Sequence, residues 1–296
     1  MTVLTGSCQK LRTIWRTEPA GVVAAAVLLF IVLTVVILPF FLPSPYTTDP
    51  MNRLLPPSAE HLLGTDGYGR DVFSRLVSGG RGSLGLVACV TLGAAACGSL
   101  VGLVSGYFPK VGAVVMRIMD AWLAFPSIIL AMVFAVSFGA SFVTEFIALV
   151  IIFTPATARV IRSRVLAVSQ RSFIEAARVS GVGNAKILLA HVFPNVLPLA
   201  LVQIVIIAAA SMLADGALSF LGLGIAPPTP TWGNMIAEGQ TFLRTHPALI
   251  IVPGLAIATC VLLLNVLGTS LRSLVDPRYR SLRDLQRVQA RRGARA

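Results

Sequence analysis

Residues 172–195 read SFIEAARVSGVGNAKILLAHVFPN, a charged, glycine-containing segment between two long apolar blocks. Ser172 and Glu175 have the S-x-x-E spacing of a capping box, which predicts that a helix begins here. Gly181 is the residue type that most readily adopts the left-handed backbone at a helix end. Asn184 is well suited to cap the helix that follows. The segment is therefore predicted to form a short helix, a tight glycine turn and a second helix.

The short helix contains two adjacent alanines, Ala176 and Ala177, and the second helix runs toward Pro194. Side chains this small leave a smooth surface that another protein can approach closely. Loops with two capped helical turns also occur in membrane proteins that have no such partner. The surroundings of the segment have to decide between these two interpretations.

The chain around this segment is strongly apolar, since 56% of its 296 residues are hydrophobic and only 12% are charged. Soluble domains contain about 25% charged residues, and about 20 apolar residues in a helix span a bilayer. These values predict an all-α, polytopic membrane protein with six transmembrane helices. The apolar blocks cover residues 20–42, 83–107, 112–138, 142–165, 196–223 and 248–271.

The distribution of basic residues predicts the orientation of the six blocks, because cytoplasmic loops are enriched in Lys and Arg. Nineteen Lys and Arg lie in the N-terminus, in the connections at 108–117 and 158–195, and from residue 272 onward. Only five lie in the other connections. Both termini are therefore predicted to be cytoplasmic. This bias also accounts for the net charge of +12 without a nucleic-acid partner.

The first apolar block is predicted to be a retained helix and not a signal peptide. It is longer than the roughly 7–15 apolar residues of a signal peptide, and no small-residue cleavage site follows it. Five prolines between Pro43 and Pro57 keep the next, external segment extended. The end of this segment has an amphipathic pattern, which predicts a helix lying in the membrane interface before the chain turns inward. The apolar face of that helix holds Val72, Phe73, Leu76 and Val77.

Glycines mark two further features of the apolar blocks. Gly98, Gly102 and Gly106 recur every four residues in the second block, a spacing that favours close helix packing over a hinge. Gly222 and Gly224 end the fifth block and precede three prolines. This combination predicts a firm helix end and a chain that bends across the outer surface.

Glu175-Ala176-Ala177, then Gly181 and a run ending in Pro194, resemble the EAA loop of bacterial ATP-binding-cassette (ABC) importer permeases. The resemblance covers about residues 20 to 283 and is strongest to the C-type permeases of peptide and nickel importers. The other motifs that carry it are Leu63-Gly-Thr-Asp66, Gly69-Arg70-Asp71, Met116-Arg117-Ile-Met-Asp120, Phe125-Pro126-Ser127, Leu218 to Gly224, Pro227 to Pro230, Trp232-Gly-Asn-Met235, Pro253-Gly-Leu255, Asn265-Val-Leu-Gly268 and Asp276-Pro-Arg278.

This resemblance implies a type I ABC importer permease fold in the bacterial cytoplasmic (inner) membrane. It implies three kinds of partner besides the bilayer's lipids: a second, related permease, two ATP-binding subunits and an extracytoplasmic solute-binding protein. ATP and Mg would be held by the ATP-binding subunits, so this chain would bind no cofactor or metal and would have no catalytic residue. The residues implied in coupling to the ATPase are Glu175, Ala176, Ala177, Gly181 and Pro194.

The predicted organisation has five parts along the chain. A cytoplasmic N-terminus (1–19) precedes the first transmembrane helix (20–42). An extracytoplasmic loop with an interfacial helix (43–82) leads into a five-helix permease domain (83–273). A basic cytoplasmic tail (274–296) completes the chain.

Three positions depart from the family pattern, namely Phe193 for leucine, Asp215 for glutamate and Thr269 for aspartate. Asp215 lies deep in its span, where a carboxylate is costly and often lines a pathway. It is therefore a candidate for the translocation path, with a structural cap or pair near Gly216 as the alternative.

Other isolated charges are given structural roles. Asp120 is predicted to pair with Arg117, and Glu145 to complement the dipole at the start of its helix. His61 and His246 are predicted to be solvated or capping groups without a metal.

Two other classes of protein fit less well. A membrane enzyme of a common kind is excluded because the chain has no Walker A motif, no H-E-x-x-H and no G-x-S-x-G. A stand-alone secondary transporter would be expected to place more ionisable groups inside the membrane. Between the substrates, peptides are favoured over nickel, because a metal path would show more His, Cys or carboxylate within the spans.

Overall fold

The computed structural model describes residues 18–275, and this part of the chain is helical, without a β-strand. Most of the predicted basic tail and of the predicted N-terminus lies outside the described residues. The described elements are α2 (Pro19–Ile37), η1 (Leu38–Phe40), η2 (Pro50–Asn52), α3 (Val72–Tyr107), α4 (Pro109–Leu123), α5 (Ser127–Phe138), α6 (Phe142–Ser169), α7 (Ser172–Val179), α8 (Asn184–Lys186), the π-helix η3 (Ile187–Val192), α9 (Phe193–Phe220), α10 (Trp232–Gly239), η4 (Gln240–Phe242) and α11 (Ala248–Val275).

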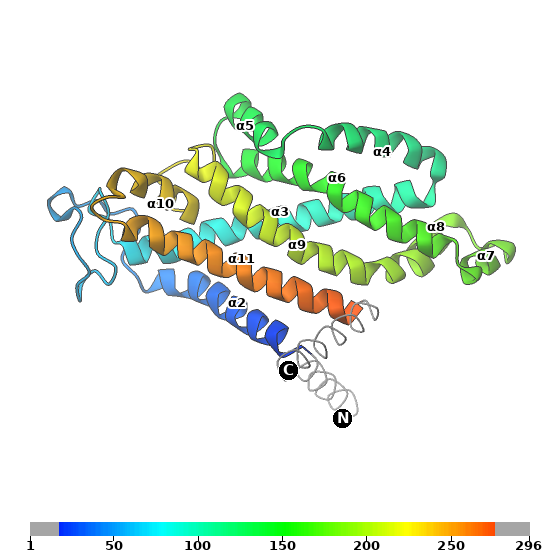
Figure 1. The fold of residues 1–296 in the computed structure, drawn as a ribbon, viewed down its shortest axis with the longest axis horizontal. Helices are drawn as coiled ribbons and strands as arrows, with labels where there is room; N and C mark the ends of the chain where they lie inside the picture. Colours follow the sequence, from blue (N-terminus) through cyan, green and yellow to red (C-terminus); the bar gives the residue numbers. More distant parts are fainter. Residues whose placement is uncertain (1–17, 276–296) are drawn as a thin grey trace, which may run out of the picture.

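The helices form an elongated bundle with two distinct ends (Figure 1). The loop at residues 41–71 and α10 lie at one end, which we call the loop end. Helix α7 lies at the opposite end, which we call the α7 end. Helix α2 runs toward the loop end and α11 runs away from it.

Five described helices are long and apolar enough to cross a membrane. They are α2 with η1, α3, α6, the continuous helix from α8 to α9, and α11. The bent pair of α4 and α5 makes a sixth if it is counted as one span. The prediction of an all-α, polytopic membrane protein is therefore confirmed, with five to six helices that could span the membrane.

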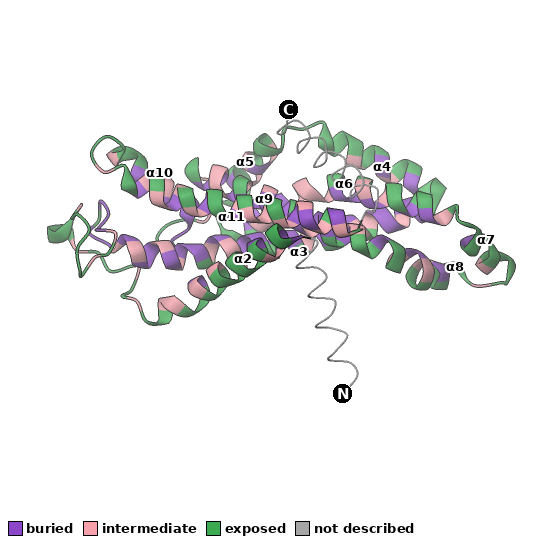
Figure 2. Ribbon diagram, turned by 60° about the horizontal axis from the view of Figure 1, so that its bottom comes forward, coloured by how far each residue is buried: buried purple, intermediate pink, exposed green. Residues whose placement is uncertain are grey.

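Buried residues concentrate along α3 and α9, whereas α2 is mostly exposed (Figure 2). Helix α3 packs against α6 and α9, and α11 packs against both α9 and α2. A hydrogen bond of 2.6 Å from the Ser273 hydroxyl to Glu18 joins the end of α11 to the start of α2. The apolar side chains left exposed on α2 suit a helix that faces lipid.

The glycine stripe of α3 packs directly on α6, as the four-residue spacing predicts. A Cβ added at Gly98 would lie 2.5 Å from the Thr157 side chain, and one at Gly106 would lie 2.7 Å from that of Val165. Between them, a Cβ at Gly102 would lie 2.7 Å from both Ile161 and the backbone oxygen of Ala158. The two helices approach so closely that only glycine fits at these positions.

The span predicted at 112–138 is not one continuous helix. The chain forms α4 and α5 there, and the two helices are bent by 84° at a short break. Pro126 explains the break, because it has no N–H to continue the helix and forces the residue before it out of helical conformation. The sequence contains the Phe125-Pro126 motif, but the prediction rested on the hydropathy of the whole block and therefore missed the break that the proline causes.

The separate interfacial helix predicted near residues 72–77 is also wrong. Helix α3 begins at Val72 and continues without interruption to Tyr107, so the chain does not turn between the predicted helix and the second span. Asp71 caps this long helix by accepting a hydrogen bond from the backbone of Ser74 at 2.7 Å. Between residues 72 and 107 there is no proline that would break the helix.

Helix α9 ends where the glycines predict. Gly222 has a φ of +75°, and its N–H donates to the Ser219 carbonyl at 3.0 Å. The N–H of Leu223 donates to the Leu218 carbonyl at 2.9 Å, which completes a Schellman motif. The chain then bends back and enters α10, whose first turn is fixed by a capping box between Thr231 and Asn234.

Candidate functional site

The segment with the EAA pattern forms the α7 end of the molecule. Helix α7 begins at Ser172, as predicted, but the capping box is absent. The cap position is Arg171, and its side chain makes no capping hydrogen bond. Because Ser172 is already the first helical residue, its hydroxyl is one position too late to cap the helix. The predicted start is correct and the predicted mechanism is not.

Gly181 ends α7 in the predicted conformation. Its φ is +77°, and its N–H donates to the Arg178 carbonyl at 3.0 Å. The N–H of Val182 donates to the Ala177 carbonyl at 3.1 Å. This is a second Schellman motif, built like the one that ends α9. A Cβ on Gly181 would meet nothing within 4 Å, so the backbone conformation alone selects glycine here.

The second helix of the segment differs from its prediction. Asn184 is the first residue of α8 and does not cap it; its side chain accepts a hydrogen bond of 2.9 Å from the Tyr107 hydroxyl on α3. The helix also does not end near Pro194, since η3 and α9 continue it to Phe220. Pro194 lacks the N–H that would bond to the preceding turn, and the π-helix lies immediately before it. Such π segments are frequent at functional sites.

Helix α7 is anchored to three membrane helices. Ile174 is fully buried in an apolar cluster. Arg178 lies one turn after Ile174, with its guanidinium 5.5 Å from the ring centre of Tyr107, a member of the same cluster. A displacement of α7 would therefore be transmitted directly to the spans. The cluster contains Leu103 and Tyr107 of α3, Ile161, Val165 and Val168 of α6, Ile174 of α7, Ile187 and Val192 of η3, and Val196 and Ala200 of α9.

The outward face of α7 is open. Glu175 and Ala176 are exposed, Phe173 is 41% exposed and Val179 is 90% exposed. We call these four residues the α7 surface. Ala177 is different, because it is partly buried and packs against the cluster that holds Ile174. Of the two alanines, only Ala176 offers free surface.

A pair of buried carboxyl groups lies on α6 and α9. Asp215 is 1% exposed and Glu145 is 3% exposed, and the two side chains are near enough to interact. The Ser219 hydroxyl donates to Asp215 at 3.2 Å. Within residues 18–275, both Glu145 oxygens and the second Asp215 oxygen have no hydrogen-bond partner.

The sequence did not predict this pairing. Glu145 does lie in the first turn of α6, as predicted, but its proximity to Asp215 depends on how α6 packs against α9. The available signal was that both spans have a single acidic residue near the same side of the membrane. Whether Asp215 contributes to the translocation path stays a prediction.

Asp120 and His61 have partners that the sequence did not predict. Asp120 pairs with Arg159 of α6 at 2.6 Å and not with Arg117. His61, predicted to be solvated or capping, has its Nδ1 2.9 Å from an Asp71 carboxylate oxygen. Both partners are distant in sequence, so local spacing could not identify them.

Comparison with known proteins identifies the family. Residues 97–281 match the family described as "Binding-protein-dependent transport system inner membrane component". The chain belongs to this family. Residues 11–57 also match the "N-terminal TM domain of oligopeptide transport permease C". The chain is thus a multi-pass inner-membrane permease subunit of an ABC importer, of the C type found in peptide and nickel systems.

Individual relatives cover most of the chain. It is 37% identical over 263 residues to a dipeptide transport system permease protein of Alkalihalophilus pseudofirmus, covering 88% of this chain and 86% of the relative. It is 34% identical over 283 residues to a di/tripeptide transport system permease protein of Pseudomonas aeruginosa, covering 92% of this chain and 93% of the relative. A nickel transport system permease protein of Escherichia coli is 38% identical over 79% of this chain and 84% of the relative.

Proposed function

We propose that this subunit forms half of a translocation pathway for di- or oligopeptides and that the α7 surface docks onto an ATP-hydrolysing partner. One observation carries the docking proposal: α7 has an open outer face and an inner face that is packed into α3, α6 and α9. If a partner displaces a helix held in this way, the three spans packed against it would move with it. Rigid-body movement of packed helices is a common form of conformational switching.

The energy for transport comes from a partner in this proposal. The full sequence has only three lysines, Lys10, Lys110 and Lys186, and none precedes Ser or Thr as a Walker A motif requires. Two ATP-binding subunits would hold ATP and Mg at the α7 end. A second, related permease would complete the pathway, and a solute-binding protein would deliver the substrate at the loop end.

Peptides are the proposed substrate. Relatives named for dipeptides and di/tripeptides cover nearly the whole chain. A nickel permease is similarly identical over a shorter stretch, so nickel is the second candidate. The chain has only three histidines, at positions 61, 191 and 246, which favours peptides because nickel prefers imidazole and other nitrogen ligands. Uptake of a labelled dipeptide and of radioactive nickel by the same assembled transporter distinguishes the two.

The proposed orientation places the α7 end in the cytoplasm and the loop end outside, in agreement with the distribution of basic residues. A cysteine at Ser58 should react with an impermeant thiol reagent added to whole cells, and a cysteine at Ser172 should not. The opposite pattern would reverse the orientation and with it the side on which the ATPase binds.

Two variants test the docking role. Ala176→Glu places a bulky charge on the exposed α7 surface without touching the apolar cluster. Gly181→Val forces a β-branched residue into a left-handed backbone, a conformation that costs about 1–2 kcal/mol even for ordinary residues. We expect both variants to insert at normal abundance and to lose peptide uptake. The ATPase should either bind weakly or hydrolyse ATP without productive transport.

Ala59→Glu is the matched control, because Ala59 is an exposed alanine at the loop end. It should retain wild-type uptake and ATPase binding. Ala177→Glu is less informative than Ala176→Glu, since Ala177 packs against the cluster and its replacement would also disturb the subunit itself. Normal uptake by both Ala176→Glu and Gly181→Val would remove the docking role from α7.

A further inference from the structure

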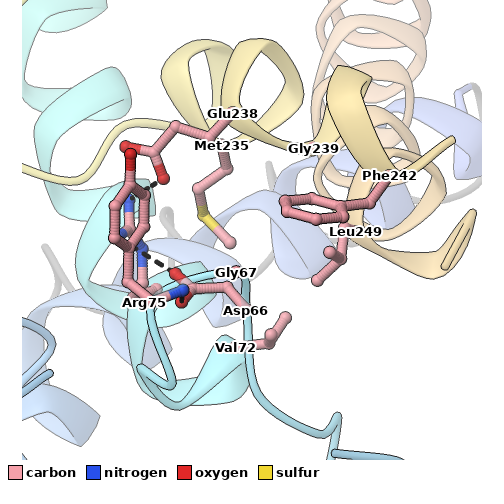
Figure 3. Close-up of a pocket in the computed structure, with 10 residues that line it drawn as sticks. Asp66, Gly67, Val72, Arg75, Met235, Glu238, Gly239, Phe242 and Leu249 are labelled. Atoms are coloured by element: carbon pink, nitrogen blue, oxygen red, sulfur yellow. Dashed lines mark hydrogen bonds and ion pairs between the residues drawn. The ribbon is translucent and has the colours of Figure 1, made fainter. Parts of the chain in front are cut away.

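Two arginines and two carboxylates form a buried cluster at the loop end. Asp66 and Arg70 belong to the loop at residues 41–71, Arg75 lies in the first turns of α3, and Glu238 lies in α10. Arg70 Nε donates to Asp66 at 2.7 Å, and its terminal nitrogen pairs with Glu238. Arg75 lies 3.3 Å from Asp66 and 3.0 Å from Glu238. Figure 3 shows the Arg75 guanidinium between the two carboxylates.

The four charges cancel, and little water reaches them. The Arg75 side chain is 2% exposed, Arg70 is 8%, Asp66 is 12% and Glu238 is 24%. Burial raises the pKa of Glu238, and the adjacent Arg70 opposes this effect. Removing one member of such a cluster leaves an uncompensated buried charge, which is strongly unfavourable.

The loop is folded so that Asp66 faces the arginines. The Asp66 side chain also accepts hydrogen bonds from the backbone of Tyr68 at 2.8 Å and of Arg70 at 3.0 Å. Gly69 has a φ of +76°, and a Cβ there would collide with the Asp49 carbonyl oxygen. The Gly69-Arg70-Asp71 motif thus has a physical reason, since only glycine allows the loop to close and present Arg70 to Asp66.

Helix α10 is attached to α3 at both of its ends. Glu238 provides the attachment near its last residue. At its first residue, Trp232 Nε1 donates to the Leu76 carbonyl at 2.8 Å, and the Trp232 backbone N–H donates to the Ser83 hydroxyl at 3.2 Å. Helix α10 also packs against α9 and α11. It therefore joins the loop, α3, α9 and α11 at the loop end.

We propose that Arg70 and Arg75 are positioning residues that make the loop end one rigid block, in which the loop, α10 and the ends of α3, α9 and α11 move together. Opening at this end then occurs between the block and the partner permease and not between helices of this chain. This inference rests on the proposed transport function. It adds to that function the rigid block, as the part that carries movement from α3 to the outer surface.

The test measures a distance within the block in the assembled transporter. Spin labels are attached at Ala59 in the loop and Thr241 in η4, both exposed, in a background that lacks the four native cysteines. Pulsed electron paramagnetic resonance then gives the distance without nucleotide and in the vanadate-trapped state. We expect one narrow distance that is the same in both states.

Glu238→Gln should broaden this distance in at least one state and lower uptake per assembled transporter about tenfold, because it leaves the arginines partly unpaired. Glu238→Asp keeps the charge and should restore most of the uptake. Glu60→Gln is the matched control, because Glu60 is an exposed acid in the same loop; it should leave distance and uptake unchanged.

Two results would contradict the proposal that the loop end is one rigid block. One is a wild-type distance that changes between the two states. The other is Glu238→Gln with wild-type distance and wild-type uptake. Failure of the wild-type chain to assemble with an ATPase is a separate outcome, and it would contradict the proposed transport function instead.

Discussion

Apolar clusters hold both ends of this permease together, but within residues 18–275 only the loop end adds buried ion pairs. At the α7 end, Ile174 enters an apolar cluster and leaves the other face of its helix open. At the loop end, Arg70 and Arg75 bind two carboxylates and join the loop to α10. An apolar contact tolerates sliding and small rotations, whereas paired buried charges tolerate little displacement, because each charge needs its partner.

This difference suits the two tasks proposed for the ends. A coupling helix has to follow the movements of a partner while staying attached to the spans, and non-directional apolar packing permits that. A surface that receives a delivered solute needs a fixed shape. Helix α3 contributes to both ends, with Arg75 near one and Tyr107 near the other, so its packing against α6 determines whether movement can pass between them.

The largest effect is expected from breaking this connection at the glycine stripe. Gly102→Ala would place a Cβ 2.7 Å from Ile161 and from the Ala158 backbone. Overpacking of this kind typically costs about 1–3 kcal/mol, and here the neighbouring backbone cannot yield easily. We expect a strong loss of the subunit from the membrane and a lower thermal unfolding temperature in detergent.

Gly85→Ala is the matched control on the same helix, because a Cβ at Gly85 would meet nothing within 4 Å. Alanine favours a helix over glycine by about 1 kcal/mol, so this variant should be neutral or slightly stabilised. Equal abundance and equal unfolding temperature for the two variants would show that the α3–α6 contact is looser than the structure indicates.

The features that sequence reasoning found are local. Gly181 and Gly222 predict their helix ends because a left-handed residue is a property of one position. The stripe from Gly98 to Gly106 predicts a helix contact because its spacing matches one helix face. The spans follow from the lengths of the apolar blocks. Each of these signals is complete within a short stretch of chain.

The features that it missed depend on distant residues or on competition between signals. The acidic pair of Glu145 and Asp215 and the cluster around Arg75 form only when helices far apart in sequence pack together. Asn184 is a good capping residue, but the Tyr107 hydroxyl binds its side chain instead. At Pro126, the apolar composition of the block outweighed the proline in the prediction, although the proline determines the backbone.

The next effect, smaller than that of Gly102→Ala, concerns Asp215. Asp215→Asn keeps the size of the side chain and an oxygen that can accept the hydrogen bond from Ser219. We expect normal assembly with the ATPase and an uptake that changes several-fold across a panel of peptides, because a carboxylate inside a span is rarely without function. Glu145→Gln changes the other member of the pair and should produce an effect of the same direction. Wild-type uptake of every peptide by Asp215→Asn would take this residue out of the path.

The smallest effect is expected from Tyr107→Phe at the α7 end. This variant keeps the ring that lies beside Arg178 and the buried apolar contacts, and it removes only the hydroxyl that donates to Asn184. The net contribution of one such hydrogen bond is about 0.5–1.5 kcal/mol, which is small compared with the apolar anchor at Ile174. We expect normal abundance and a modest fall in peptide uptake per ATP hydrolysed, since α8 would be held less firmly to α3. Ile174→Ala, which opens the apolar cluster, should be far more damaging in the same assay. If Tyr107→Phe were as damaging as Ile174→Ala, the α7 end would depend on directional bonds as the loop end does, and the contrast between the two ends would fail.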